Sequence, residues 1–263
     1  MTAPAIVVEQ LSHVIEGQRV LEKVSFTVER GEFWSIVGRN GAGKTTLLKC
    51  LNRIYTGWSG RIQIDGDPLD ILSQKELARR VSYVPQPGEA LSPFTVREFA
   101  LMSRYPHLSP FTSIQPRDEQ AVEEALTITE TKPFAARSLT TLSGGERQKV
   151  FIAAALAQGA PIMLLDEPTT FLDYRHQVEV LRLLRRINRE ASTTILAVTH
   201  DINTALRASD HVLALKNGRI VYLGSAQGVA GEATLARIYD VSFQFLIDPE
   251  SGSAVVVPKE GGA

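Results

Sequence analysis

The feature that most constrains this chain is a glycine-rich stretch at residues 38–45, Gly-Arg-Asn-Gly-Ala-Gly-Lys-Thr. An apolar run at 32–37 precedes it, and residues 45–54 follow it with leucines at helical spacing. Strand, loop and helix in this order form the context that a phosphate-binding loop of the pattern G-x-x-x-x-G-K-[ST] requires. Glycines let the backbone turn so tightly that its N–H groups converge on a phosphate. The stretch therefore predicts an α/β domain with an anion site at a helix start.

The residue types in this loop predict how a nucleotide would be held. Lys44 is expected to reach the β- and γ-phosphates, and Thr45 to ligate Mg²⁺ through its hydroxyl. The helix that opens at Thr45 or Thr46 adds the positive end of its dipole. The predicted nucleotide-binding set of this loop is Gly38, Arg39, Asn40, Gly41, Ala42, Gly43, Lys44, Thr45 and Thr46.

Strand and helix patterns alternate along most of the chain. Strands are predicted at 5–15, 19–29, 32–38, 60–66, 161–167, 193–200 and 212–224, the last a hairpin around Asn217-Gly218. Helices are predicted at 45–54 and 176–190, and the region 75–158 carries mostly helical patterns, at 75–83, 95–104 and 117–129. This order predicts a largely parallel sheet with a helical insertion. The expected division is a catalytic α/β core with a β subdomain at 1–87 and 159–225, a helical subdomain at 88–158 and an appendix at 226–263.

Charge and composition exclude several classes of protein. The 28 Lys and Arg nearly balance the 29 Asp and Glu, which argues against nucleic-acid binding through bulk charge. Cys50 is the only cysteine, so no internal disulfide can form, and a packing role is expected for it. The first ten residues lack a basic segment, and no run approaches the ~18 apolar residues that suggest a membrane span. We expect a cytosolic protein that reaches a membrane only through a partner.

Two acids end the apolar strand predicted before residue 168. Asp166 is expected to support Mg²⁺, as acids at this place do in phosphate-loop ATPases. Glu167 is expected to orient or deprotonate the attacking water. The alternative is a pair of acids at a solvent-facing strand end. A phosphate-binding loop in the same chain favours the functional interpretation.

A second anion site is predicted at the start of another helix. Ser143 and Glu146 have the S-x-x-E spacing of a capping box, so Ser143 should cap a helix that runs through residues 150–158. Between them lie Gly144 and Gly145, which leave the N–H groups of the helix start accessible to a phosphate. The alternative for Ser143, Gly144, Gly145 and Glu146 is a helix cap with no ligand.

The string Leu-Ser-Gly-Gly-Glu at 142–146 decides between these alternatives. It follows the phosphate loop and precedes Met-Leu-Leu-Asp-Glu-Pro at 163–168. This arrangement resembles the ATP-binding cassette (ABC) ATPases, and the resemblance extends from about residue 5 to 225. It implies a P-loop NTPase core of the RecA-like type, with an N-terminal antiparallel β subdomain and an inserted helical subdomain.

The resemblance also assigns roles to residues that carry no signal alone. Gln86, in Tyr-Val-Pro-Gln, is implied to touch Mg²⁺ or water and to sense a membrane partner. Asp173, in Phe-Leu-Asp, lies in the loop that crosses between two subunits, and His200 is implied to reach the γ-phosphate. The implied catalytic set is Lys44, Gln86, Glu167 and His200, and the implied metal ligands are Thr45, Gln86 and Asp166.

The resemblance implies a head-to-tail homodimer. Each MgATP lies between the phosphate loop of one chain and residues 143–146 of the other. The chain departs from the family at Ile15, where an aromatic ring usually stacks on the adenine. An aliphatic side chain stacks less well there, and His13 is the nearby candidate to compensate.

The resemblance leaves three classes of ABC protein open: a transporter ATPase with a separate permease, a DNA-repair or chromosome-organising ATPase, and a translation-type protein. The DNA-repair and chromosome-organising kind needs a coiled coil between the two anion sites, and the translation kind usually carries two cassettes. Neither feature is present, which favours a transporter subunit that acts with separate permease chains. The segment 95–111 followed by 117–126, and the segments 166–184 and 235–252, resemble importers of iron–siderophore complexes, haem and cobalamin.

Importers of metal ions or oxyanions are the alternative class of transporter. In either case the implied permease docks around Gln86 and residues 88–115, and a substrate-binding protein acts indirectly. The implied location is peripheral, on the cytoplasmic face of the inner (cell) membrane. No nucleic-acid partner is expected.

Overall fold

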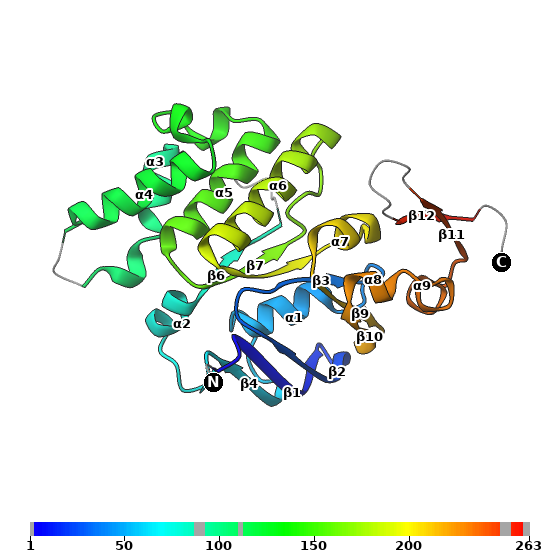
Figure 1. The fold of residues 1–263 in the computed structure, drawn as a ribbon. Helices are drawn as coiled ribbons and strands as arrows, with labels where there is room; N and C mark the ends of the chain where they lie inside the picture. The colour runs from blue at the N-terminus through cyan, green and yellow to red at the C-terminus, as the bar shows by residue number, and fades with distance from the viewer. Residues whose placement is uncertain (1–2, 87–92, 110–112, 248–253, 260–263) are drawn as a thin grey trace. The chain divides into compact units, whose positions relative to one another are not determined.

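The computed structural model describes residues 3–86, 93–109, 113–247 and 254–259 (Figure 1). The chain forms two compact units. Unit 1 comprises Met1–Leu69 and Leu196–Ala263, and unit 2 comprises Asp70–Ile195. Strand β8 (Thr194–Val198) supplies residues to both units.

Unit 1 begins with an antiparallel sheet. Its strands, in the order β2-β1-β4-β5, are β1 (Ile6–Ile15), β2 (Gln18–Val28), β4 (Ser59–Ile64) and β5 (Asp67–Pro68). In β2 the alternate residues Val24, Phe26 and Val28 are buried, as the period-two pattern predicts for a strand with one covered face. The predicted N-terminal antiparallel β subdomain is confirmed.

The rest of the α/β part of unit 1 surrounds the glycine loop. Strand β3 (Phe33–Val37) pairs in parallel with β9 (His211–Lys216), and β9 forms a hairpin with β10 (Arg219–Ser225). Asn217 and Gly218 turn this hairpin at φ values of 50° and 75°, which explains the Asn-Gly pair. Helix α1 (Lys44–Leu51) buries its leucines and Cys50. Cys50 is fully buried, which confirms its predicted packing role. This burial raises the pKa of its thiol to about 12.

Unit 1 ends with the elements that follow β8 and β10, among them the described parts of the C-terminal segment, residues 226–247 and 254–259. The elements that follow β8 and β10 are α7 (Ile202–Ala208), α8 (Ala226–Val229), α9 (Glu232–Tyr239), β11 (Phe243–Ile247) and β12 (Ala254–Pro258). Strands β11 and β12 pair as an antiparallel hairpin, which the sequence patterns do not predict. The Asn203 amide fastens β12 to α7, because its Nδ2 donates to the Val256 carbonyl at 2.9 Å and its Oδ1 accepts from the Val256 N–H at 2.8 Å.

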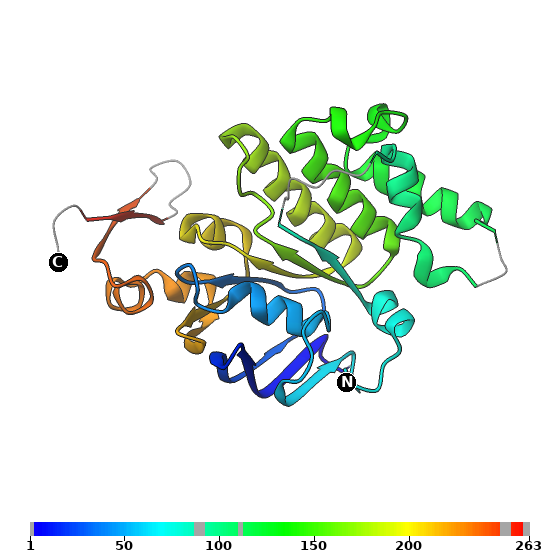
Figure 2. The same ribbon diagram turned by 180° about the vertical axis from the view of Figure 1, so that it is seen from behind.

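Unit 2 combines a short parallel strand pair with a group of helices (Figures 1 and 2). The strands are β6 (Val81–Val84) and β7 (Ile162–Asp166). The helices are α2 (Gln74–Arg80), α3 (Val96–Met102), α4 (Pro116–Ile128), α5 (Gly144–Gln158) and α6 (Tyr174–Ala191), with 3-10 turns at Tyr105–His107, Lys132–Phe134 and Leu139–Thr141. The prediction of a helix at 75–83 is wrong for the residues after Arg80, where α2 ends. Residues 81–84 form a strand because their backbone pairs with β7.

Helices α3, α4 and α5 share one apolar core in unit 2. Val96, Val122, Leu126 and Val150 are among its fully buried members. The same helices also meet at a buried ion pair. Arg104 Nε lies 3.1 Å from Asp118 Oδ1, and Arg104 Nη1 donates to the Ala157 carbonyl at 2.7 Å.

Throughout the described ranges, no helix combines the length and the apolar character needed to cross a membrane.

Candidate functional site

The glycine loop of unit 1 is folded around Lys44. Lys44 Nζ donates to the carbonyls of Gly38, at 2.9 Å, and Arg39, at 3.0 Å. Only 6% of Lys44 is exposed, so the ammonium group is held inside the loop. Helix α1 begins at Gly43 without a side-chain cap. A helix start that follows a glycine loop and has no side-chain cap is of the kind that binds phosphate.

Two positions in the loop admit only glycine. Gly38 has φ 140°, and a Cβ there would lie 2.2 Å from the Leu215 carbonyl oxygen. Gly43 has φ 101°, and its Cβ would lie 2.8 Å from the Val20 carbonyl oxygen. Backbone atoms of neighbouring strands thus fix the path of the loop, and the spacing of the motif follows from this packing.

His200 lies in unit 1, at the same sheet edge as the glycine loop. The Thr199 N–H donates to the Ile36 carbonyl at 3.0 Å, so the end of β8 lies beside the end of β3. Strand β3 continues into Gly38, and β8 continues into His200, which is exposed. Asp201 caps α7 by accepting from two backbone N–H groups and so fixes the turn that carries His200.

The acids of unit 2 follow a parallel strand pair. Val84 lies opposite Leu165, so the ends of the two strands are neighbours: Asp166 is the last residue of β7, and Gln86 lies two residues beyond the end of β6. Asp166 is 2% exposed, and the Tyr83 hydroxyl donates to its Oδ2 at 3.3 Å. Glu167 has the left-handed φ of 49°, and the Thr170 hydroxyl donates to its Oε2 at 2.7 Å. The two adjacent carboxylates are thus held differently, which suits them to different roles.

The capping box at the start of α5 is confirmed. The Glu146 N–H donates to Ser143 Oγ at 3.3 Å, and the Ser143 N–H donates to Glu146 Oε2 at 2.8 Å. The bond from the Ser143 N–H lowers the pKa of the Glu146 carboxyl, although partial burial opposes this. Arg137, 3.6 Å from the carboxylate, lowers it further. The helix start that carries Gly144 and Gly145 is therefore rigidly fixed.

Sequence reasoning missed a contact that joins this helix start to α6. Asp173 Oδ1 accepts from the backbone N–H of His176 at 2.9 Å and lies 2.8 Å from His176 Nδ1. These bonds lower the pKa of Asp173. The His176 ring lies against Gly145, where a Cβ would come within 2.1 Å of His176 Cδ2. Glycine inside a helix lowers its stability, so a glycine at position 145 could have indicated that another group approaches the helix closely there.

This contact predicts opposite responses at the two glycines of α5. A Cβ at Gly144 would meet only Leu172 Cδ2, at 3.7 Å, so Gly144→Ala should stabilise the fold by about 0.5–1 kcal/mol through helix propensity. Gly145→Ala should be destabilising, because the ring must move and break its bond to Asp173. Urea unfolding without nucleotide measures both. Adding His176→Ala to Gly145→Ala should relieve the clash, and equal stability of the two single variants would contradict the geometry.

The position expected for an adenine-stacking residue holds no ring. Ile15 ends β1 opposite Gln18 and is half-buried. His13 is 6% exposed, and its ring stacks on Tyr55 with the centroids 5.6 Å apart. His13 is therefore engaged in packing and is not presented to a base.

The predicted site residues are divided between the two units. Unit 1 contains the loop Gly38–Thr46 and His200, whereas unit 2 contains Gln86, Ser143–Glu146, Asp166, Glu167 and Asp173. Within the described ranges, no cluster of three or more His, Cys, Asp or Glu side chains could hold a metal by itself.

Comparison with known proteins identifies the family. Residues 21–170 match the ABC transporter family, and the chain belongs to it. Its members include the ferric enterobactin transport ATP-binding protein of Escherichia coli (strain K12), which is 40% identical over 95% of this chain and 92% of its own length. The iron(3+)-hydroxamate import ATP-binding protein of Bacillus subtilis (strain 168) is 37% identical over 94% of this chain and 92% of its own length.

Solved structures agree with this assignment. A metal-chelate type ABC transporter in an inward-facing conformation has a TM-score of 0.86 and 27% identity, with 98% of both chains covered. A dimeric ATP-binding cassette bound to ADP and phosphate has a TM-score of 0.72 and 28% identity, covering 84% of this chain and 98% of the other. The predicted fold class and the predicted ABC ATPase activity are confirmed.

Proposed function

We propose that this chain is the ATP-hydrolysing subunit of a membrane importer for an iron chelate (siderophore), haem or cobalamin. The observation that carries the proposal is the presence of two helix starts suited to phosphate in one chain. One follows the glycine loop in unit 1, and the other begins α5 in unit 2. The names of the relatives, which transport ferric enterobactin, iron(3+)-hydroxamate or cobalamin, support this substrate class.

In the proposed cycle, two copies bind two ATP molecules head to tail. Lys44 and the loop backbone hold the phosphates, while Ser143 and Gly145 of the second copy cap the γ-phosphate. Glu167 polarises the attacking water, and His200 contacts the γ-phosphate. Positioning and charge stabilisation provide the catalysis. Closure of the dimer changes the access state of the permease, and hydrolysis resets it.

The proposed metal ligands form an all-oxygen set that suits Mg²⁺. They are the Thr45 hydroxyl, the Gln86 amide oxygen and the Asp166 carboxylate. Asp166 is almost fully buried with a hydroxyl donor at one oxygen, which fixes the orientation of its carboxylate. A bound Mg²⁺ neutralises charge that develops on the phosphates.

An apolar groove in unit 2 is the proposed docking place for the permease. It measures 360 Å³, and its walls include Pro85, Phe99, Met102 and Phe151. Met102 is 54% exposed and lies beside other apolar groove residues, and contiguous exposed apolar surface is typical of protein–protein contact sites. The groove adjoins Gln86 through Pro85, and this position supports the proposed docking around Gln86. The parts of that region at 87–92 and 110–112 lie outside the described residues.

The remaining assignments belong to this proposal. The chain is peripheral on the cytoplasmic face of the cell membrane, and a substrate-binding protein delivers the cargo to the permease. Residues 88–158 act as the helical subdomain that carries Ser143, and 226–263 remain an appendix to the catalytic core.

The composite site is tested by mixing two inactive chains in the reconstituted transporter. A Ser143→Arg chain has a damaged second half-site, and a Lys44→Ala chain has a damaged phosphate loop. In a mixed dimer both lesions fall in one site, and the other site is intact. In an equal mixture half of the dimers are mixed, and each mixed dimer has one intact site out of two. The mixture should therefore recover about a quarter of the wild-type ATPase rate. An ATPase rate no higher than that of either variant alone would refute the composite site.

A further inference from the structure

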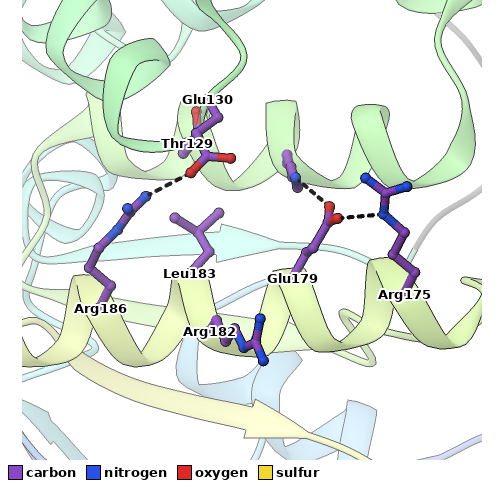
Figure 3. A pocket seen from close by; sticks show the side chains of 8 residues that line it. Thr129, Glu130, Arg175, Glu179, Arg182, Leu183 and Arg186 are labelled. Atoms are coloured by element: carbon purple, nitrogen blue, oxygen red, sulfur yellow. Dashed lines mark hydrogen bonds and ion pairs between the residues drawn. The ribbon is translucent and has the colours of Figure 1, made fainter.

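A basic pocket in unit 2 lies outside all the residues assigned to nucleotide binding. It has a volume of 480 Å³, within the range of small-molecule sites. Its wall is formed by α6, by Lys149 of α5 and by the residues that follow α4 (Figure 3). Four cationic side chains line it against two carboxylates, although the chain as a whole has a net charge of −1.

The spacing along α6 accounts for this concentration of charge. Arg175, Glu179, Arg182 and Arg186 recur at helical intervals and therefore share one face of the helix. Arg182 and Arg186 are four residues apart, an arrangement that repels in an isolated helix. Leu183, which is buried, lies between them and provides an apolar wall. An anion in the pocket would offset the repulsion between the two arginines.

The pocket's carboxylates are already matched by cations. Lys149 Nζ donates to Glu179 Oε2 at 2.7 Å, and Arg175 Nε donates to Glu179 Oε1 at 3.0 Å (Figure 3). Arg186 donates to the Ile128 carbonyl and lies 3.8 Å from Glu130. Across the described residues, Arg182 has no hydrogen bond or ion pair. The positive charge of the pocket is thus only partly compensated, and Arg182 is the group available to a ligand.

We propose that this pocket binds a multivalent phosphate-bearing anion. A guanidinium fork matches the oxygens of a phosphate and binds them with charge-assisted hydrogen bonds. A concave cationic surface also concentrates multivalent anions from solution. The anion would contact α6 and Lys149 of α5, and so connect the two helices whose starts carry Asp173 and Ser143. Its source is either a soluble phosphate compound or a phospholipid headgroup.

Pyrophosphate titration calorimetry on the full chain tests this site. The chain should carry Lys44→Ala, so that the phosphate loop does not contribute to binding. Saturable binding is expected, and Arg182→Gln should weaken it about tenfold, the effect of losing one charge-assisted hydrogen bond. Arg189→Gln is the control, because it also removes one positive charge from α6 but Arg189 does not line the pocket. This variant should bind pyrophosphate with unchanged affinity. Weakening should also follow a rise in ionic strength.

Co-sedimentation with vesicles of phosphatidylcholine containing a phosphorylated phosphatidylinositol distinguishes the two sources. If the chain binds the vesicles, and Arg182→Gln weakens this binding while Arg189→Gln does not, the ligand is a phospholipid headgroup. Pyrophosphate binding with the same pattern, without vesicle binding, would assign it to a soluble phosphate. If neither probe binds, or if both variants weaken binding equally, the pocket is not an anion site. The composite ATPase site does not depend on either outcome.

Discussion

Replacing Glu167 by glutamine should reduce the ATPase rate by about 10²–10⁴-fold, the usual contribution of a general base. Glutamine keeps the size of the side chain and can still accept the hydrogen bond from Thr170. Binding of ATP should therefore persist, and the head-to-tail dimer should accumulate because its ATP is not consumed. Phosphate release measures the turnover, and light scattering with and without ATP measures the dimer.

Glu190→Gln is the matched control, because this exposed residue lies in the last turn of α6 and is not among the residues assigned to nucleotide binding. A wild-type ATPase rate in Glu167→Gln would show that Glu167 is not the base. The same variant tests the cargo in cells that lack the native chain. Wild type should restore uptake of a ferric siderophore, haem or cobalamin, and Glu167→Gln should not. Restored uptake of only a free metal ion or an oxyanion would overturn the proposed substrate class.

Breaking the buried ion pair of unit 2 should have the largest effect on stability. Arg104→Gln should lower the free energy of unfolding by about 3–5 kcal/mol, because it leaves a buried carboxylate without its cation. Asp118 is 0% exposed, and the Ala157 carbonyl would lose its donor as well. Urea unfolding followed by circular dichroism, without nucleotide, measures the change.

The matched control is Arg117→Gln, which removes a neighbouring exposed arginine and should change the stability little. Burial opposes ionisation of Asp118, but the Gln115 N–H and Arg104 together lower the pKa of its carboxyl. A lowered pKa contributes stability above the unfolded-state value, and this stability is lost as the pH falls. The difference between wild type and Arg104→Gln should therefore narrow at acid pH. Equal losses in the Arg104 and Arg117 variants would mean that the pair is not structural.

The parts of the fold that the sequence predicts are those with local causes. The glycine loop is predicted because Gly38 and Gly43 are required by the backbone itself. The capping box of α5 involves residues only three apart, and the Asn217-Gly218 hairpin needs only two residues of positive φ. Each of these can be recognised in a window of a few residues.

The features that were missed depend on contacts between distant segments. Strand β6 has only four residues, and its partner β7 begins 78 residues after it ends, at Ile162. Periodicity cannot detect so short a strand. The hairpin of β11 and β12 is held by Asn203, and Arg104 meets Asp118 only after α3 and α4 have packed. The roles of Gln86 and His200 came from family resemblance, because a lone glutamine or histidine has no pattern of its own.

The contact between Gly145 and His176 has a consequence for how related sequences can diverge. The His176 ring fills the space that a side chain at 145 would need, so the two positions share one volume. A homologue with alanine or serine at the second glycine should carry a smaller residue than histidine at the position of His176. The substitutions should therefore appear as correlated pairs in an alignment, with the small residue moving from one helix to the other.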